Sequence, residues 1–297
     1  MRPQFRPQFE WDLGTRKLIL GQRTLLMGIV NVTPDSFSDG GLHFDPNLDD
    51  PVKAVQHALQ LLDEGADIVD IGGESTRPGA AAIVSAEQEL NRVLPVIERV
   101  KRERPEAVVS VDTYKARVAQ AAVEAGAEIV NDVSGGTWDC DMLPTLANLS
   151  CGFVLMHMRG RPSAWRTLPP IGDAVAVVRE ELRDRARDAA AHIAASRIVL
   201  DPGFGFGKSF EENFPLVANF ESLHELGYPI LGGVSRKSFI GRMLATGKGD
   251  APIENRLHGT LAVEAALVLK GAHILRTHDV RASRDAVRTA DAILQAS

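Results

Sequence analysis

Short runs of β-branched and other apolar residues alternate along the chain with longer segments in which apolar residues recur every three or four positions. The first pattern predicts buried strands and the second predicts helices that bury one face. Their alternation is typical of βαβ units and a parallel sheet. The runs predict eight strands, at residues 24–32, 66–73, 107–113, 127–135, 152–158, 197–203, 228–235 and 272–280. Eight is the number that a closed (β/α)₈ barrel requires.

The segments between these strands support the same fold. Three of them end on glycine directly before a strand, at Gly65, Gly126 and Gly271, and glycine readily adopts the left-handed conformation that ends a helix. The beginning of the chain differs, because FEWDLGTRKLIL alternates around a turn and predicts a short hairpin within residues 1–20 that closes the barrel bottom. We therefore expect one TIM-barrel domain over residues 1–297. Helical spacing is found at residues 50–65, 85–105, 114–126, 173–196 and 254–271.

Composition narrows the classes of partner. The net charge is −6 and no basic run is present, which argues against a nucleic-acid partner. No apolar run reaches the length of a membrane span, and the N-terminal segment lacks the apolar core of a signal peptide. Cys140 and Cys151 are too few for a disulfide framework and lack the spacing of zinc ligands, so we expect two buried thiols. These features predict a cytoplasmic enzyme.

The stretch LDPGFGFGKS, residues 200–209, has the glycines, lysine and hydroxyl of a phosphate-binding loop. A P-loop requires glycine where Pro202 stands, and the dinucleotide fingerprint requires it at Lys208 or Phe210. Both nucleotide motifs are thus excluded, and Asp201 needs another explanation. For Lys208 two interpretations stay open, a surface lysine or a contact of a substrate-binding loop.

Nearly every predicted strand ends in hydrogen-bonding side chains, at the rim where barrels of this type carry their active sites. One such residue is readily explained as a helix cap or a satisfied core group, but eight strand ends at one rim indicate a site. The polar residues at or just after these ends are Asn31, Glu74, Thr76, Arg77, Asp112, Asn131, Asp132, His157, Asp201, Ser235, Lys237, Arg276 and His278.

The chemistry of these side chains predicts the kind of ligand. The carboxylates and amide at Asp112, Asn131 and Asp201 suit a flat heterocycle that presents donors and acceptors, whereas the neighbouring cations suit an anion. The glycine-rich loops 32–41 and 72–82 read as lids that close over substrate. Without a His/Cys cluster, the expected metal is a hard cation such as Mg²⁺, held mainly by substrate phosphates.

Eight segments carry a resemblance to a known family. They are MGIVNVTPDSFSDGG, DIGGESTRPGA, SVDTYKA, IVNDVSGG, MHMRG, DPGFGFGK, GGVSRKSFIG and RTHDV. With these segments in family order between about residues 27 and 280, the chain resembles the dihydropteroate synthases. The resemblance implies a transferase of folate biosynthesis that condenses a hydroxymethyl-dihydropterin diphosphate with p-aminobenzoate, releasing diphosphate. It also implies Mg²⁺-assisted ionisation of the C–O bond, attack by the aromatic amine, and a homodimer.

The resemblance further implies roles for individual residues. The pterin ring is expected at Asp112, Asn131, Asp201, Lys237 and Arg276. The diphosphate is expected at Asn31, Thr76, Arg276, Thr277 and His278, with Asn31 also binding the metal. The p-aminobenzoate is expected at Phe37, Thr76, Arg77, Pro78, Phe206, Ser235 and Lys237. The residues expected to take part in catalysis are Asn31, Asp35, Asp112, Lys237, Arg276 and His278.

Two alternatives remain beside this interpretation. A pterin-binding methyltransferase of the same barrel superfamily would share the ring-binding residues but would not need the cluster of anion-binding residues. A noncatalytic pterin-binding barrel would be expected to have lost one of them, and Asn31, Arg77, Lys237, Arg276 and His278 are all present. The segment around Arg161, Trp165 and Arg166 departs from the family pattern, which affects the expected shape of one loop.

Overall fold

The computed structural model describes residues 6–32, 51–75 and 84–296. Eight parallel strands form one sheet in the order β8-β7-β6-β5-β4-β3-β10-β9, and a parallel bridge between Leu200 and Ile230 joins its two end strands. The predicted eight-stranded barrel is thus confirmed. Its strands are β3 (Leu25–Asn31), β4 (Ile68–Gly72), β5 (Val108–Asp112), β6 (Ile129–Asp132), β7 (Gly152–Met156), β8 (Ile198–Asp201), β9 (Leu231–Gly232) and β10 (Ile274–Thr277).

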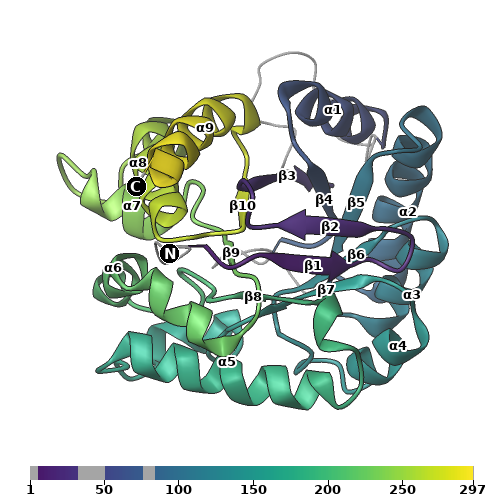
Figure 1. The fold of residues 1–297 in the computed structure, drawn as a ribbon, viewed down its shortest axis with the longest axis horizontal. Coiled ribbons are helices and arrows are strands. Elements are labelled where there is room, and N and C mark those ends of the chain that lie inside the picture. Colours follow the sequence, from purple (N-terminus) through teal and green to yellow (C-terminus); the bar gives the residue numbers. More distant parts are fainter. Residues whose placement is uncertain (1–5, 33–50, 76–83, 297) are drawn as a thin grey trace.

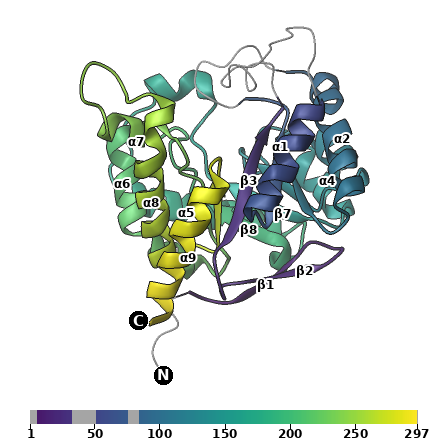
Figure 2. The same cartoon turned by 90° about the horizontal axis from the view of Figure 1, so that it is seen from above.

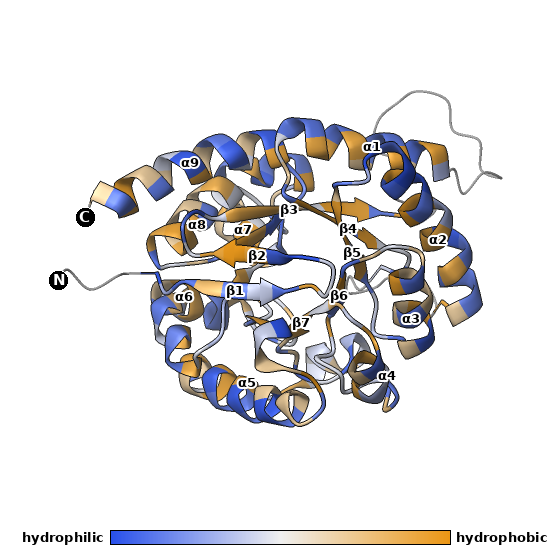
Figure 3. Cartoon of the chain, turned by 45° about the vertical axis from the view of Figure 1, so that its right-hand side comes forward, coloured by the Kyte–Doolittle hydropathy of each residue, from blue (hydrophilic) through white to orange (hydrophobic). Residues whose placement is uncertain are grey.

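Helices form a ring around these strands (Figure 1). In Figure 3 the strands are mostly hydrophobic, while the outer helices alternate between hydrophobic and hydrophilic residues, as expected for helices with one buried face. Within the described residues, no helix combines the length and the apolar character that a membrane crossing requires. The helices are α1 (Pro51–Glu64), α2 (Ala86–Glu103), α3 (Ala116–Glu124), α4 (Met142–Asn148), α5 (Ala174–Ala190), α6 (Phe210–Ala218), α7 (Ser238–Met243), α8 (Leu257–Leu269) and α9 (Val280–Ala296).

All five predicted helices are present, as α1, α2, α3, α5 and α8. The glycines predicted to end three of them have φ angles of +106°, +109° and +88°, at Gly65, Gly126 and Gly271, so each takes the left-handed conformation. Four further helices were not predicted. Of these, α4 and α7 have only seven and six residues, and α6 contains Pro215, so their patterns are weak. Helix α9 has clear helical spacing and was simply missed.

The predicted N-terminal hairpin is confirmed, as β1 (Phe9–Asp12) paired antiparallel with β2 (Lys17–Leu20). It lies across one end of the barrel (Figure 2). Trp11 is fully buried, and its indole N–H donates to the carbonyl of Arg197 at 2.8 Å. At Gly152, an added Cβ would lie 2.6 Å from Leu13 Cδ2 and 2.9 Å from Trp11 Cε2. The hairpin therefore fits closely against the start of β7 and closes the barrel bottom.

The prediction of two buried thiols was half wrong. Cys151 is buried immediately before β7, but Cys140 is exposed. Cys140 lies in the turn that leads into α4, where the neighbouring Asp139 binds two backbone amides, those of Ala116 at 2.8 Å and Asp141 at 3.0 Å. A turn held by such local bonds runs over the surface, which leaves its remaining side chain in solvent.

Candidate active site

The interior of the barrel has an apolar lower layer and a polar upper layer. Successive side chains of a strand point to opposite faces, so positions two apart share a face. Ile68, Val108 and Ile129 therefore pack with the hairpin at the bottom, and Asp70 and Asn131 lie one step higher on the same face. The polar layer is thus built on rigid strands directly above an apolar floor.

Arg276 connects the polar layer across the barrel. Its Nε donates to Asp70 Oδ2 at 2.6 Å, and its Nη2 donates to Asp112 Oδ2 at 2.7 Å. Asn131 Nδ2 donates to the same oxygen of Asp70 at 2.9 Å. Side chains from β4, β5, β6 and β10 are thereby held in one network. Charge-assisted bonds of this kind are short and directional, so they fix the guanidinium and both carboxylates in place.

Asp70 is a site residue that the sequence analysis missed. It is fully buried, in the middle of β4 rather than at its end. Among the described residues, its Oδ1 has no hydrogen-bond partner, and neither has the hydroxyl of Ser110, its neighbour in register on β5. The available signal was a single charged residue between Val69 and Ile71 in a predicted core strand, since a buried carboxylate requires a partner.

Burial shifts the pKa values of the groups around this network towards neutrality. It raises the pKa of Asp112 to about 7, against the opposing effect of the Arg276 guanidinium. Burial also raises the pKa of Asp201, although Lys237 and the Gly203 amide favour its charged form. It lowers the pKa of Lys237 to about 7, because an ammonium loses hydration there. The charge state of the site is therefore sensitive to pH near neutrality.

The loop after β8 explains the glycines of DPGFGFGK. Gly203, Gly205 and Gly207 have φ angles of +65°, +77° and +67°. These alternating left-handed turns direct successive carbonyls towards two lysines. Lys237 Nζ donates to the carbonyl of Phe204, and Lys208 Nζ donates to that of Gly203 at 2.7 Å. The loop therefore presents carbonyls to cations rather than amides to a phosphate.

Lys208 is buried, so its interpretation as a surface lysine was wrong. Asp201, in contrast, was expected to face a ligand, and the structure places it on the inner face at the end of β8. Its Oδ1 accepts the Gly203 amide at 2.7 Å, which orients the carboxylate.

An apolar wall stands beside Lys237. The Phe206 ring lies with its centroid 4.2 Å from Lys237 Nζ, and the Trp165 ring meets Phe206 edge to face at 5.5 Å. Arg161 lies over the ring of Trp138 at 4.8 Å. Two residues of the segment that departs from the family pattern thus pack near the site. The wall is formed by Tyr114, Val133, Trp138, Met156, Met158, Trp165 and Phe206. It suits a flat aromatic ring.

Hydroxyl and imidazole groups gather at the end of β10. Ser235 Oγ lies 3.0 Å from His278 Nδ1 and accepts the His278 amide at 3.2 Å. Thr277 Oγ1 lies 3.4 Å from the same oxygen. Helix α9 begins two residues after His278, and a helix N-terminus favours anions. The neighbouring Arg236 is paired with Asp279. The cluster Ser235, Thr277 and His278 therefore offers donors for an anion.

For a metal, Asn31 is the best-placed residue of the predicted set. It ends β3, which pairs directly with β10, the strand that leads to Thr277 and His278. One uncharged oxygen next to an anion-binding cluster fits Mg²⁺, which commonly keeps several waters and binds through substrate phosphates. Asp139, Cys140 and Asp141 have ligand atoms within 4.8 Å of one another, but the Asp139 carboxylate already binds backbone amides.

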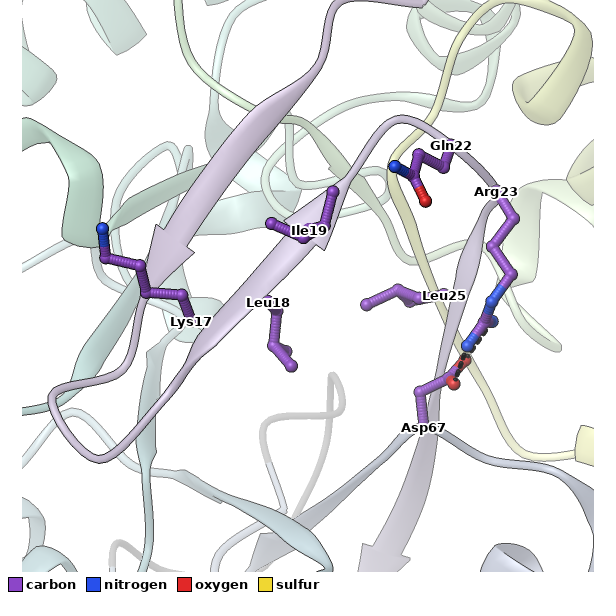
Figure 4. Close-up of a pocket in the computed structure, with 7 residues that line it drawn as sticks. All are labelled: Lys17, Leu18, Ile19, Gln22, Arg23, Leu25 and Asp67. Atoms are coloured by element: carbon purple, nitrogen blue, oxygen red, sulfur yellow. Dashed lines mark hydrogen bonds and ion pairs between the residues drawn. The ribbon is translucent and has the colours of Figure 1, made fainter.

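The remaining predicted site residues, Asp35, Phe37, Thr76, Arg77 and Pro78, lie outside the described residues. A separate surface cavity of about 470 Å³ lies between the hairpin and β3, at the end of the barrel opposite to the polar strand ends (Figure 4). The paired Arg23 and Asp67 lie on its wall. It shares no residue with the polar layer and so is not part of the candidate active site.

Comparisons with known proteins agree with this arrangement. Residues 27–278 match the family described as pterin binding enzyme. The dihydropteroate synthase of Clostridium beijerinckii is 42% identical over 284 residues, which cover 95% of this chain and 99% of that protein. The structure of Xanthomonas albilineans dihydropteroate synthase with 4-aminobenzoic acid superposes with a TM-score of 0.86 at 44% identity, over 98% of this chain and 100% of that one.

The same Xanthomonas enzyme in complex with 7,8-dihydropteroate gives a TM-score of 0.80 at 42% identity, over 94% of this chain and 97% of that one. Sequence, fold and coverage thus agree over nearly the whole length. The chain therefore belongs to the dihydropteroate synthase family of pterin-binding enzymes.

Proposed function

We propose that the protein condenses a hydroxymethyl-dihydropterin diphosphate with p-aminobenzoate, forming dihydropteroate and diphosphate. The observation that carries this proposal is the Arg276 network, in which one guanidinium joins the carboxylates of Asp70 and Asp112 above the apolar floor of the barrel. Family membership supports the class of enzyme, a transferase of folate biosynthesis.

The pterin ring binds in the polar layer. Its amino group and ring N–H are donors that suit the carboxylates of Asp112 and Asp201, and Asn131 has an amide that both donates and accepts. Asp70 holds Arg276 and Asn131 from below, so they are fixed before the ligand arrives. Such preorganisation reduces the entropy that binding must remove.

The diphosphate lies towards the end of β10. Arg276 offsets part of its charge, the cluster of Ser235, Thr277 and His278 supplies further donors, and Asn31 would help hold Mg²⁺ there. Bound Mg²⁺ would neutralise part of the charge that develops on the leaving group. The C–O bond breaks with its electron pair on the diphosphate, leaving a resonance-stabilised pterin cation. The amine nitrogen then bonds to the methylene carbon and releases a proton.

The p-aminobenzoate packs against the apolar wall. Phe206 offers its ring, and Lys237, which lies over that ring, is placed to bind the carboxylate, with Ser235 as a further donor in the proposal. Phe37, Thr76, Arg77 and Pro78 complete this subsite in the proposal. Lys237 contacts both the loop after β8 and the ring of Phe206, which places it between the two substrates.

We also propose a homodimer located in the cytoplasm, in keeping with the family resemblance. Light scattering of the purified protein measures its mass in solution, and a mass near 64 kDa, about twice that of the chain, would agree with a homodimer. A mass of one chain at all concentrations used in the enzyme assay would contradict it.

The direct test measures diphosphate release and dihydropteroate formation together. Dihydropterin diphosphate and Mg²⁺ are supplied with and without p-aminobenzoate, and a parallel reaction contains a chelator. We expect dihydropteroate only when both substrates and Mg²⁺ are present. Pterin binding without product would refute the proposed reaction. Methyl transfer from methyltetrahydrofolate to a corrinoid acceptor would then identify the superfamily's methyltransferase activity instead.

Pterin binding is expected to weaken as the pH falls below neutrality. With a pKa of about 7, Asp112 is mostly ionised at pH 8 and mostly protonated at pH 6, where it is a weaker acceptor for the pterin ring. The ionised fraction of such a group falls about tenfold from pH 8 to pH 6, so we expect a Kd about tenfold higher at pH 6. Calorimetry should use the hydroxymethyl-dihydropterin without its diphosphate, because phosphate groups titrate in the same range.

Asp112→Asn is the matched control for this titration. It cannot ionise, so its weaker binding should lose most of the pH dependence, and what remains reports Asp201, Lys237 and the rest of the network. An equally steep dependence in Asp112→Asn would assign the titration to one of those other groups.

A further inference from the structure

Three polar side chains, linked by hydrogen bonds, reach the loop after β8 from outside the substrate-facing layer. Glu181 of α5 lies with Oε2 3.1 Å from His157 Nε2, and His157 Nδ1 lies 2.9 Å from Lys208 Nζ. His157 is fully buried and Lys208 is nearly so, whereas the Glu181 carboxylate is 43% exposed. Three charged or ionisable residues from three segments thus meet behind the loop.

Glu181, at one end of this hydrogen-bonded series, determines which atoms of His157 and Lys208 donate and which accept. The Glu181 carboxylate accepts, so His157 carries a hydrogen on Nε2, and Nδ1 is left as an acceptor. Lys208 must therefore donate to His157. Its other donations go to the carbonyls of Gly203, at 2.7 Å, and Phe206, at 3.4 Å. Burial lowers the pKa of Lys208 well below its usual value, but these three acceptors match the three N–H groups of an ammonium and so favour the charged form.

These bonds determine where the loop lies. Lys208 binds the carbonyls of Gly203 and Phe206 on one side, and Lys237 binds the carbonyl of Phe204 on the other. The loop is held between two lysine side chains at three of its carbonyls. Because the Phe206 backbone is fixed in this way, its ring is held 4.2 Å from Lys237 Nζ. The hydrogen bonds of Lys208 go to His157 and to the carbonyls of this loop, and its side chain is buried.

We propose that Lys208 is a positioning residue for the aromatic-amine subsite. Oriented by Glu181 through His157, it holds the Gly203–Gly207 loop in the conformation that presents Phe206 and Lys237 to p-aminobenzoate. The inference rests on the proposed function and extends it, because it assigns a residue that controls the affinity for one of the two substrates. The pterin ring binds mainly to groups on the strands, so it is much less affected.

The test replaces Lys208 with methionine, which keeps the length of the apolar stem and removes the donors. The loop carbonyls of Gly203 and Phe206 then lack their partner, and we expect the KM for p-aminobenzoate to rise about tenfold. The Kd of hydroxymethyl-dihydropterin should change less than about threefold, within the effect of one peripheral contact. Steady-state kinetics with saturating pterin substrate and calorimetry of the pterin separate the two effects.

Lys101→Met is the matched control. Lys101 also donates to two backbone carbonyls, those of Pro105 at 2.9 Å and Ala107 at 2.8 Å, but at the start of β5, away from the active-site end. If loss of a lysine that binds carbonyls acts only through stability, both variants should have lower melting temperatures and neither should show a selective change in KM. A selective rise in KM for Lys208→Met alone supports the positioning role.

A second variant changes Glu181, at the other end of the hydrogen-bonded series of Glu181, His157 and Lys208. Glu181→Met removes a half-exposed side chain, so the protein should fold even if Lys208→Met does not. Without its acceptor His157 is no longer oriented, and we expect a smaller rise in the same KM. Unchanged KM for p-aminobenzoate in both variants, in a protein whose wild type is active, overturns the inference alone. A wild type that forms no dihydropteroate overturns the proposed function and the inference with it.

Discussion

Replacing Arg276 with alanine is expected to lower turnover about a hundredfold, since one lost donor to a departing charge costs roughly 3 kcal/mol in a preorganised site. The effect is large because Arg276 is joined to two carboxylates, Asp70 at 2.6 Å and Asp112 at 2.7 Å. Without the guanidinium these carboxylates face the anionic diphosphate without the cation that separates them from it. Initial rates with both substrates saturating measure the change in kcat.

In Arg276→Ala, a loss of folding stability must be distinguished from a loss of catalytic rate. Asp70 is fully buried, so the loss of its partner is expected to lower the melting temperature. The double variant Arg276→Ala with Asp70→Asn removes the unpaired charge. It should regain stability without regaining turnover.

A control arginine lies at the opposite end of the barrel. Arg23 also pairs with a carboxylate, that of Asp67, but its side chain is 58% exposed. Exposed ion pairs contribute little, so Arg23→Ala should leave kcat unchanged and stability nearly so. Near-native turnover of Arg276→Ala would show that Arg276 has no part in the reaction.

Gly203→Ala is expected to destabilise the protein far more than the same change two residues later. Gly203 has a φ of +65°, and an added Cβ would lie 1.9 Å from the carbonyl oxygen of His157, a backbone atom that cannot move aside cheaply. Gly205 has a similar φ of +77°, but its added Cβ would only approach Lys237 Cδ, at 3.4 Å. The two positions thus share the backbone strain and differ in the space available.

The left-handed conformation alone costs an L-residue about 1–2 kcal/mol, which is the loss expected for Gly205→Ala. For Gly203→Ala we expect at least about 3 kcal/mol, because the loop must also move away from β7. Urea denaturation of both variants measures the difference, provided that the slopes agree with the wild type. An equal decrease in the free energy of unfolding for both variants would mean that the loop can move away from the His157 carbonyl at little cost. That outcome would contradict the rigidity inferred from the loop's hydrogen bonds.

The fold was predictable because its signals are local. Eight β-branched runs, the turn in FEWDLGTRKLIL and the glycines at helix ends each reflect short-range chemistry that the structure preserves. The weaker elements were not predictable in the same way. Strand β9 has two residues where the pattern predicted eight, since Gly232 and Gly233 supply no side chains that favour a strand and the ring closes there through one bridge.

The site was predictable where strand ends carry it. Asp112, Asn131 and Asp201 end strands or lie one residue before the end. They were predicted because barrels of this type carry their active sites at the C-terminal ends of the strands. Asp70 lies within a strand, and its role depends on Arg276, more than 200 residues away in the chain. The contact of Lys208 with His157, and of His157 with Glu181, likewise depends on how α5 packs, which residue spacing does not reveal.

The hairpin at the barrel bottom affects the route by which ligands enter the site and products leave it. Trp11 and Leu13 pack over the apolar floor, so the hairpin closes one end of the barrel, and in the part of the chain that the structure describes the polar layer faces the other end, at the strand ends. A ligand that binds at the polar layer must enter before anything that packs above it, and a product that spans both levels must leave through the same opening. Under the proposed reaction the pterin substrate therefore arrives first, and an early aromatic amine would obstruct it, so the position of the polar layer between the floor and the strand ends sets an order of binding.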